Sequence, residues 1–349
     1  MISKELRSIF TQAVGYAKNS KHEYLTLEHV FLMLIHDKTI ENLFLDLGVD
    51  TDKLFSDIKK YIDKEISFEE AMELTQIKGS KLMELFSVAN EIREKKCGNQ
   101  MDACTITNAK SGLCSENCKF CAQSAFYDTG IETYDLKNVK KLHEEYDNAN
   151  NIGSSKFGVV TSGRGIKKGT KDFEDIKRFI KEAKDSGKDT KLCVSIGLLN
   201  KEELLELKEV GLTRIHSNLQ TSINSYEKLV ADTHKIEDRI ETIKIAKEIG
   251  LDVCSGGIIG LGETWQDRIE MAFTLKELGV ESIPINILTP IKGTPMGNRE
   301  LLAIDEILKT IAIYRIINKD KNIRIAAGRE GRMKDFMGMA FMSGANGML

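Results

Sequence analysis

Residues 102–124, DACTITNAKSGLCSENCKFCAQS, join a β-rich run to a loop that carries three closely spaced cysteines. Cys114, Cys118 and Cys121 have the spacing C-x3-C-x2-C. Three thiolates on one short loop can bind three irons of a four-iron cluster and leave the fourth iron without a protein ligand. A zinc site would need a fourth Cys or His at a similarly short spacing, and the nearest following histidine, His143, lies in a charged helical stretch. The spacing therefore favours a [4Fe–4S] cluster with one open iron, placed directly after a strand.

Outward from this loop, short apolar or β-rich runs alternate with charged helical stretches. The expected strands are 102–107, 156–162, 191–197, 214–219, 252–260, 282–288 and 323–328. This alternation predicts an α/β fold in which parallel strands close into a TIM-type (β/α)8 barrel. An eighth strand would begin near Asn346, close to the last residue, Leu349. We therefore expect a barrel that is incomplete at its eighth strand and has exposed strand edges there.

The first 64 residues follow a different, all-helical pattern. Apolar residues recur at helical spacing in residues 5–19, and further helices are expected at residues 28–35 and 51–62. A capping-box pattern, Ser67-Phe-Glu-Glu70, then opens the next helix. The sequence thus predicts a small helical domain over residues 1–64 and the barrel over residues 65–349.

The composition excludes several classes of protein. The 349-residue chain has 41% hydrophobic and 30% charged residues and a net charge of −3, which gives no indication of a nucleic-acid partner. It contains no run of about eighteen apolar residues, so no membrane-spanning helix is expected, and its N-terminus lacks the pattern of a secretory signal. We therefore expect a cytoplasmic protein whose seven cysteines serve metal binding rather than disulfides.

A second motif follows the strand expected at residues 252–260. It runs Gly256-Gly-Ile258-Ile-Gly260-Leu-Gly-Glu263, and its small residues allow the backbone to approach a planar group closely. Together with the cysteine loop, in which Phe120 precedes the last cysteine, it resembles the radical S-adenosylmethionine (SAM) superfamily. The resemblance implies that SAM binds the open iron, that the second motif lines its adenine, and that one electron from the cluster releases a 5′-deoxyadenosyl radical.

Residues from about 65 to 349 resemble the biotin synthase family in particular. The segments NAKSGLCSENCKFCAQS, TSGRG, NLQTS, CSGGIIGLGET, SIPINIL, KGTP, IRIAAGRE and FMSGAN occur in family order. The resemblance implies radical insertion of sulfur into dethiobiotin, with an auxiliary iron–sulfur cluster as sulfur donor. It also implies a low-potential electron donor (flavodoxin or ferredoxin) and a homodimer. The alternatives are a related radical SAM barrel, either hydrogenase-maturase-like or methylornithine-synthase-like.

The same resemblance assigns residues to the inside of the barrel. Cys193, Cys254 and Arg324 match the family's auxiliary-cluster ligands. Asn218 matches a residue that contacts SAM and substrate, and Asn286 matches one that holds the ureido ring of dethiobiotin. Each lies in a different expected strand, and a lone buried guanidinium such as that of Arg324 needs a counter-charge.

The chain departs from the family pattern at two of these positions. Gly158 stands where the common pattern has a cysteine ligand of a [2Fe–2S] cluster. We expect Cys104, at the first strand, to replace it, so that Cys104, Cys193 and Cys254 hold an altered cluster of a four-iron type. Gln220 stands where the family has an acidic residue at the SAM ribose. Weaker SAM binding is expected, because Gln is neutral and partly a donor.

The helical region before the barrel resembles one repeat of the N-terminal domain of Clp ATPases. The resemblance rests on HEYLTLEHVFLMLI (22–35), a GVD turn and the helix expected after it. It implies a Clp adaptor as partner, although no Walker motif follows in the chain. The alternatives are a helical bundle without a retained partner, and an inactive fusion fragment that acts only through this segment.

Overall fold

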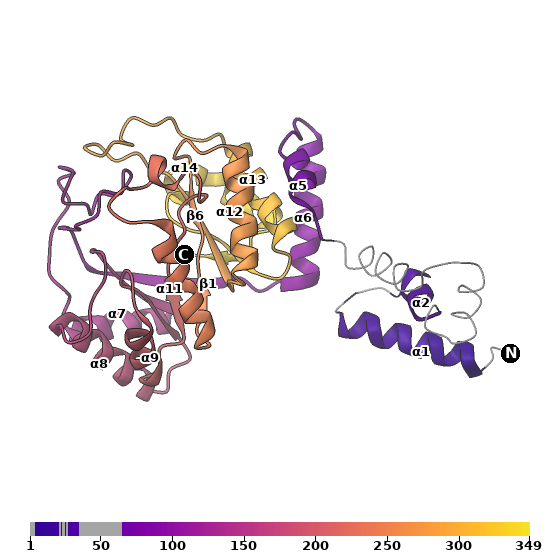
Figure 1. Cartoon of the computed structure of the whole chain (residues 1–349), viewed down its shortest axis with the longest axis horizontal. Coiled ribbons are helices and arrows are strands. Elements are labelled where there is room, and N and C mark those ends of the chain that lie inside the picture. The colour runs from indigo at the N-terminus through magenta and orange to yellow at the C-terminus, as the bar shows by residue number, and fades with distance from the viewer. Residues whose placement is uncertain (1–3, 21, 23–24, 26, 35–64) are drawn as a thin grey trace. The chain divides into compact units, whose positions relative to one another are not determined.

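The computed structural model describes residues 4–20, 22, 25, 27–34 and 65–349. The chain divides into two compact units, Met1–Ser67 and Phe68–Leu349 (Figure 1). The helix expected at residues 51–62 lies outside the described residues.

In the first unit, two helices pack against each other. These are α1 (Lys4–Asn19) and α2 (Leu27–Leu34). Ile9, Ala13 and Ala17 are buried along one side of α1, as is Leu32 of α2. The spacing of four residues between the buried positions of α1 places them on a single helix face. The predicted helical character is confirmed for these two segments.

The second unit is a parallel barrel, as the alternation of strands and helices predicts. Its strands are β1 (Asp102–Lys110), β2 (Lys156–Thr161), β3 (Lys191–Ser195), β4 (Arg214–His216), β5 (Asp252–Cys254), β6 (Gly257–Ile259), β7 (Ser282–Ile287), β8 (Asn322–Ile325) and β9 (Gly347–Met348). They are hydrogen-bonded in the order β5-β4-β3-β2-β1-β9-β8-β7-β6, and β5 also pairs with β7. The single strand expected at residues 252–260 is therefore split into β5 and β6, which together fill one position of the barrel.

The barrel is closed at the strand nearest the last residue. Strand β9 pairs with β1, where Asp102 lies opposite Gly347, and with β8, where Arg324 lies opposite the same glycine. The eighth strand is thus only two residues long, yet it joins its two neighbours. The barrel is thus short at its eighth strand, as expected, but its edges are joined over two residues on each side: Asp102 and Ala103 of β1, and Arg324 and Ile325 of β8.

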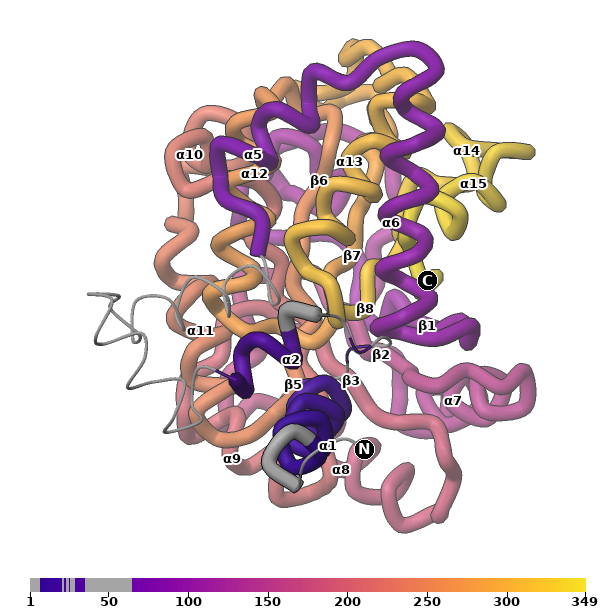
Figure 2. The backbone as a smooth tube through the Cα atoms, turned by 90° about the vertical axis from the view of Figure 1, so that its right-hand side faces the viewer, coloured from indigo at the N-terminus to yellow at the C-terminus, as the bar shows by residue number. Residues whose placement is uncertain are grey.

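Helices form the outer layer around these strands (Figures 1 and 2). They are α5 (Phe68–Leu74), α6 (Lys81–Cys97), α7 (Val139–Asn151), α8 (Lys171–Asp185), α9 (Lys201–Glu209), α10 (Tyr226–Leu229), α11 (Ile236–Glu248), α12 (Trp265–Glu277), α13 (Ile304–Ile317), α14 (Arg329–Met333), η1 (Lys334–Phe336) and α15 (Met337–Met342). Helix α8 buries Phe173, Ile176, Phe179 and Ile180 against the barrel, and the Thr170 side chain caps its first turn by accepting from the Phe173 amide.

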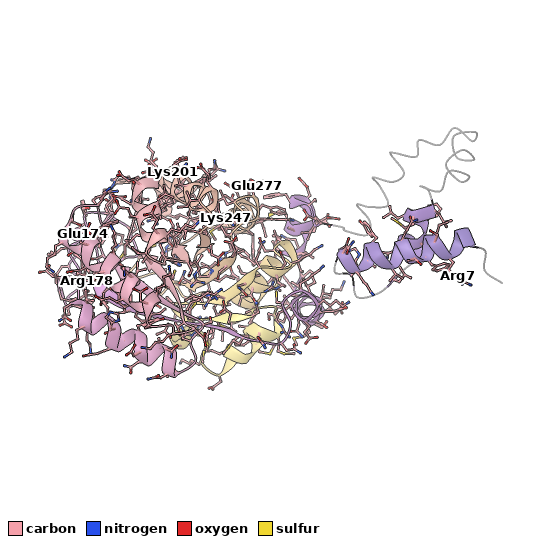
Figure 3. All side chains as sticks on the ribbon, turned by 90° about the horizontal axis from the view of Figure 1, so that it is seen from below. Arg7, Glu174, Arg178, Lys201, Lys247 and Glu277 are labelled. Carbon is pink, nitrogen blue, oxygen red and sulfur yellow. The ribbon has the colours of Figure 1, made fainter. Side chains whose placement is uncertain are left out.

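The charged helical stretches expected from the sequence have their charges on the outside of the barrel. Figure 3 shows Glu174 and Arg178 of α8, Lys201 of α9 and Glu277 of α12 at this surface, and all four are exposed. Among the described residues, no helix has the length and apolar character needed to cross a membrane.

Two helices precede β1 and belong to the barrel unit. Helix α5 begins at Phe68, directly after Ser67 of the predicted capping box, and packs against α12, while α6 packs against α13. The rings of Phe68 and Phe273 lie 5.8 Å apart, and the Lys309 ammonium donates to the Thr75 carbonyl at 3.0 Å. Residues 68–97 are thus anchored on the helical layer of the barrel.

Candidate active site

The cysteine loop leaves the C-terminal end of β1 and folds back on itself. The Cys114 amide donates to the Gln123 carbonyl at 2.9 Å, and the Ala125 amide donates to the Cys114 carbonyl at 2.8 Å. The Cys121 amide donates to the Cys118 carbonyl at 3.0 Å. These backbone hydrogen bonds close a tight loop at the face of the barrel where catalytic groups of this architecture gather.

The three thiols of this loop fit an iron–sulfur cluster. Burial raises the pKa of Cys118 to about 12, and the neighbouring Cys121 and Cys114 add to that shift. Burial also raises the pKa of Cys121, and Cys114 adds to it. Cys118 and Cys121 are therefore poorly solvated beside Cys114, and free thiolates at these two positions are disfavoured unless iron compensates their charge.

The arrangement does not suit a single ion. Across the described part of the chain, no three His, Cys, Asp or Glu side chains converge closely enough to hold one metal ion. A cubane differs from such a site, because each thiolate ligand binds a different iron and the sulfurs stay apart. The donor set and its spacing fit a [4Fe–4S] cluster with one iron left open.

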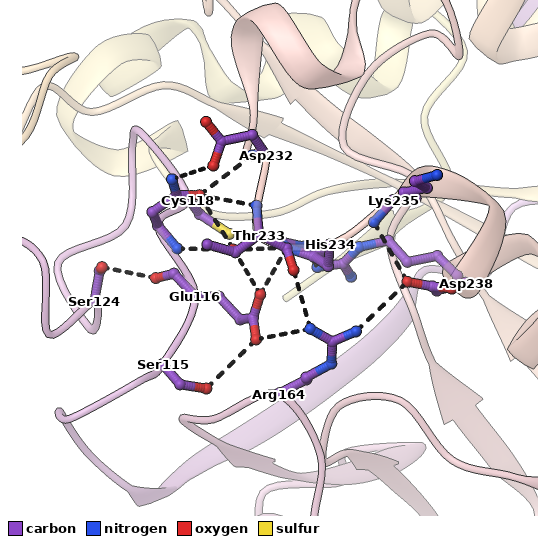
Figure 4. Close-up of polar contacts among 12 residues, drawn as sticks. Ser115, Glu116, Cys118, Ser124, Arg164, Asp232, Thr233, His234, Lys235 and Asp238 are labelled. Atoms are coloured by element: carbon purple, nitrogen blue, oxygen red, sulfur yellow. Dashed lines mark hydrogen bonds and ion pairs between the residues drawn. The ribbon is translucent and has the colours of Figure 1, made fainter.

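A buried polar network holds the cysteine loop against residues 230–239 (Figure 4). The Glu116 carboxylate lies 3.0 Å from Nδ1 of His234 and accepts from the Thr233 hydroxyl at 2.6 Å. The other ring nitrogen of His234, Nε2, lies 2.9 Å from the Tyr226 hydroxyl and 3.9 Å from Sγ of Cys118. The loop position is therefore set by partners more than 100 residues away in sequence.

His234 was not among the residues expected at the site, since the sequence indicates no histidine ligand. Burial and the positive charge of Arg239 lower the pKa of His234, while Glu116 opposes them. Nη2 of Arg239 lies 3.0 Å from Nε2 of His234. In the sequence, His234 lies two residues before helix α11, and no local pattern there indicates that it reaches the cysteine loop.

The glycine motif forms a crowded turn at β6. A Cβ on Gly256 would lie 2.0 Å from the Pro284 carbonyl oxygen, and one on Gly257 would lie 2.5 Å from Sδ of Met271. Only glycine fits at either position. Ile258, the next residue of the motif, is also buried.

Glu263 closes this motif by binding its backbone. Its carboxylate accepts from the Gly260 amide at 2.8 Å and from the Gly262 amide at 3.0 Å. It also accepts from Nε of Arg268 at 2.7 Å, and both side chains are only 2% exposed. Glu263 therefore shapes the turn, while the backbone around Gly260 provides the surface that a planar group could approach.

Asn218 and Gln220 are brought directly against this motif. The Asn218 side-chain oxygen accepts from the Gly256 amide at 3.0 Å. Gln220 forms a parallel bridge with Gly257 and has a φ of 75°. Its side-chain oxygen is buried and has no hydrogen-bond partner among the described residues. An unsatisfied buried acceptor is what a hydroxyl donor on a ligand would complete.

A cavity of about 180 Å³ lies inside the barrel. It gathers residues from seven different strands, and its lining includes Cys104, Cys193, Arg214, His216, Cys254, Asn286, Arg324 and Leu349. The residues expected at the auxiliary cluster and the substrate are thus placed together. Asn286 lies at its edge, where its amide donates to the Gly257 carbonyl at 3.0 Å and accepts from the Ala327 amide at 3.2 Å.

Position 158 is a glycine rather than a cysteine, and the neighbouring strand β1 carries a cysteine, Cys104. Gly158 pairs with Ile106 on one side and with Cys193 on the other. A Cβ at Gly158 would lie 3.1 Å from Cγ2 of Ile106. The Ile106 side chain therefore occupies space beside the glycine, and Cys104 lies two residues before it on β1.

The charges in the cavity differ from those expected. Nη2 of Arg214 lies 3.2 Å from Sγ of Cys104, and its Nε lies 3.4 Å from Sγ of Cys193. Burial raises the pKa of Cys193. At Cys254, burial also acts to raise the pKa. The pKa is nevertheless lowered to about 6, because His216 contributes a charge and a hydrogen bond and Arg214 contributes a charge.

Arg324 is already paired within the protein. Its Nη2 donates to the Asp102 carboxylate at 2.6 Å, and its Nε donates to the Ser282 hydroxyl at 3.3 Å. The counter-charge that this buried guanidinium needs is therefore Asp102. Arg214 was missed by reasoning from the sequence, where it appears only as the first residue of the run RIHSNL.

A parallel barrel with a three-cysteine loop after its first strand and a glycine motif at its sixth defines a radical SAM enzyme. The model of the Radical SAM superfamily matches residues 110–275, and that of the Biotin and Thiamin Synthesis associated domain matches residues 284–349. A biotin synthase from Clostridium botulinum is 47% identical over 291 residues, covering 83% of this chain and 89% of the relative. One from Pelotomaculum thermopropionicum is 44% identical over 301 residues, covering 85% and 92%. The chain belongs to the biotin synthase family of radical SAM enzymes, which confirms the family expected from the sequence.

Solved structures share the fold at much lower identity. A methylornithine synthase superimposes with a TM-score of 0.72 at 18% identity, covering 83% of this chain and 84% of that one. A maturase of the [FeFe]-hydrogenase superimposes with a TM-score of 0.71 at 19% identity, covering 90% and 72%. At this identity the two likenesses show a common fold alone.

The first unit also matches a family model. The Clp repeat N-terminal domain matches residues 1–100, which confirms the resemblance seen in the sequence. The match extends past Ser67 into α5 and α6, which pack on helices of the barrel.

Proposed function

We propose that this enzyme inserts sulfur into dethiobiotin to form biotin, with an auxiliary iron–sulfur cluster inside the barrel as the sulfur donor. The observation that carries the proposal is the single cavity shared by three cysteines and Asn286. When bound, SAM and the [4Fe–4S] cluster supply a radical that abstracts hydrogen from an unactivated carbon. Sulfur, substrate and radical source must then lie close together, and a barrel whose first strand lines the cavity and leads into the cysteine loop suits this requirement.

The binding of SAM is assigned to two groups of residues. Cys114, Cys118 and Cys121 hold the [4Fe–4S] cluster, with Phe120 half-buried in the same loop. Asn218, Gln220 and the glycine motif of Gly256, Ile258, Gly260 and Glu263 surround the nucleoside. The partnerless oxygen of Gln220 supports this assignment, because a ribose hydroxyl can donate to it.

The auxiliary cluster is assigned to Cys104, Cys193 and Cys254, and the cluster is proposed to be of a four-iron type. The absence of a thiol at Gly158 removes one ligand of the common [2Fe–2S] pattern. Arg214, His216 and Arg324 supply positive charge or hydrogen bonds around these sulfurs, which suits an anionic cluster. The ureido ring of dethiobiotin is assigned to Asn286, whose amide offers both a donor and an acceptor.

The experiment compares two cysteine variants of the full chain. Cys104→Ala is expected to lose the iron and the Mössbauer signal of the auxiliary cluster and to form no biotin from dethiobiotin, SAM and a low-potential reductant. Cys97→Ala is the matched control, because Cys97 lies outside the cavity and contacts Arg315. It is expected to keep both clusters. If C104A binds as much iron as the unchanged protein and still forms biotin, the ligand assignment is wrong.

Further partners follow from the same assignment. The electron donor is proposed to be a flavodoxin or ferredoxin, the assembly a homodimer, and the location the cytoplasm. Residues 65–349 are proposed as the catalytic domain, and residues 1–64 as a Clp-like domain that binds a Clp adaptor, supported by the family match over residues 1–100. A pull-down with a Clp adaptor, using the full chain and a version that lacks residues 1–64, tests the last point. Equal capture of both versions would exclude it.

A further inference from the structure

Gln220 has a backbone conformation that its surroundings must enforce. Its φ of 75° lies in the left-handed region, where a residue other than glycine is strained and persists only if neighbouring contacts hold it. Its amide donates to the Gly256 carbonyl at 3.0 Å, and its carbonyl accepts from the Ile258 amide at 2.9 Å. These two hydrogen bonds fix Gln220 on the side of the glycine motif. On its other side the chain continues through residues 221–225, a turn that leads into α10.

One buried carboxylate, that of Asp267, anchors this turn. Asp267 is 8% exposed and lies in the first turn of α12. Its Oδ1 accepts from the hydroxyls of Ser222 and Ser225, each at 2.6 Å. Ser222 is 1% exposed, and its hydroxyl oxygen also accepts from the Ser225 amide at 3.3 Å. The turn is therefore closed on itself and tied through Oδ1 to α12.

The other oxygen of the same carboxylate holds the end of the glycine motif. Oδ2 accepts from the amide and the hydroxyl of Thr264, both at 2.7 Å, and Thr264 directly follows Glu263. Burial acts to raise the pKa of Asp267, but the hydrogen bonds from Ser222, Ser225 and Thr264 lower it to about 2. Asp267 is thus an ionised acceptor that binds two donors from each of the two segments.

Resting on the assignment of Gln220 to the SAM ribose in the proposed function, we propose that Asp267 is a positioning residue for this contact. Through Ser222 it fixes the backbone two residues after Gln220. Through Thr264 the same carboxylate is fixed to the motif that surrounds the nucleoside. The partnerless side-chain oxygen of Gln220 is therefore held in a constant place relative to that motif. Both oxygens of Asp267 are occupied by protein donors, so it acts through Gln220 rather than on SAM itself.

Two variants remove this link in different ways. Asp267→Ala removes it entirely and also removes the capping box of α12, which Asp267 forms with Thr264. Ser222→Ala removes a hydrogen bond on the side of the turn only. Because S222A leaves Asp267 to cap α12, it keeps the test decisive if D267A folds poorly. Gln220→Ala is the reference, since it removes the proposed ribose contact directly.

The matched control is Glu203→Ala. Glu203 is also a buried carboxylate, 2% exposed, at the third position of a capping box, that of α9. It accepts from the Asn200 amide at 2.8 Å and from the Lys168 amide at 3.2 Å. E203A therefore removes a comparable buried cap from a helix whose partners lie in other loops.

The test measures equilibrium binding of SAM, and of its analogue without ribose hydroxyls, to the full chain with its [4Fe–4S] cluster assembled anaerobically. One lost hydrogen bond weakens binding by about tenfold, so the unchanged protein is expected to prefer SAM over the analogue by about that ratio. Q220A is expected to lower the ratio to near one. D267A and S222A are expected to lower it below about threefold, while E203A keeps it. A merely structural role of Asp267 would lower the melting temperature and leave the ratio unchanged.

The outcomes separate this inference from the proposed function. If Q220A lowers the ratio but D267A and S222A keep it, the inference is overturned and the ribose assignment stands. If E203A lowers the ratio as much as D267A does, the effect is a general loss of stability, and the inference is again overturned. If Q220A keeps the ratio, the ribose does not bind at Gln220. The assignment in the proposed function is then refuted, and the role of Asp267 is refuted with it.

Discussion

Replacement of Glu263 by alanine tests the part of the site that shapes the SAM motif. The Glu263 carboxylate is 2% exposed and binds Arg268, which is equally buried, as well as the amides of Gly260 and Gly262. In Glu263→Ala, the two amides lose their acceptor. Arg268 keeps one carboxylate, that of Glu306 at 2.7 Å, whose side chain is 34% exposed.

The two carboxylates bound to Arg268 allow a matched comparison. Removing one partner of a buried ion pair costs about 3–5 kcal/mol, whereas a partly exposed pair contributes about 0–1 kcal/mol. At about 2 °C per kcal/mol for a domain of this size, Glu263→Ala is expected to lower the melting temperature by roughly 6–10 °C. Glu306→Ala, which touches the same arginine, is expected to lower it by no more than roughly 2 °C.

The assay is thermal unfolding of the two variants beside the unchanged protein, followed by SAM binding under anaerobic conditions. SAM affinity is expected to fall in E263A, because the amides of Gly260 and Gly262 are no longer held in place. It is expected to stay unchanged in E306A. Equal melting temperatures for the two variants would refute the reasoning, since Glu263 would then have no special role in the turn.

Two further outcomes follow from the same contacts. Gln220→Glu is expected to tighten SAM binding by about fivefold to tenfold, because a carboxylate accepts charge-assisted hydrogen bonds from ribose hydroxyls. Equilibrium binding measures this change in affinity. An unchanged affinity would mean that the ribose binds elsewhere. Burial raises the pKa of Asp102, but hydrogen bonds from Lys156 and Ser155 and the charge of Arg324 lower it to about 2. The ionised carboxylate thus stabilises the fold above about pH 4 and loses this effect as the pH falls through about 2. Asp102→Asn is therefore expected to melt several degrees lower than the unchanged protein at pH 7, with the gap closing toward pH 2; a gap that is constant with pH would contradict the assignment.

Much of the barrel could be predicted from local pattern, because each strand and each helix has its own signature. The run at residues 156–162 became β2 (Lys156–Thr161), and the charged stretch after it became α8 (Lys171–Asp185). The break between β5 and β6 was not predictable in the same way. Gly256 lies under the Pro284 carbonyl of β7, so the break depends on a neighbour from a distant part of the chain.

The parts of the site also differed in how far they could be predicted from local sequence. The cysteine loop is contiguous, so three residues within eight positions were enough to indicate a cluster. The network of Glu116 and His234 joins residues 118 positions apart, and no local pattern indicates it. Arg214 sits in a short strand whose partners are decided by the register of β3 against β4. An arginine in such a run appears from sequence as a surface residue, because its burial depends on thiols from β1 and β3.

The register also explains why the auxiliary site should differ from the common pattern by more than one residue type. A thiol at position 158 would lie opposite Ile106, but Cys104 is two residues earlier on β1. Two residues of a strand span about 6.6 Å, so the replacement sulfur is displaced along the barrel as well as onto the neighbouring strand. A group that reaches Cys104, Cys193 and Cys254 together must therefore extend further along the barrel axis than one bound at position 158. The proposed four-iron cluster is larger than a two-iron one and so agrees with this longer reach. The side chain of Arg214 lies beside two of the three sulfurs.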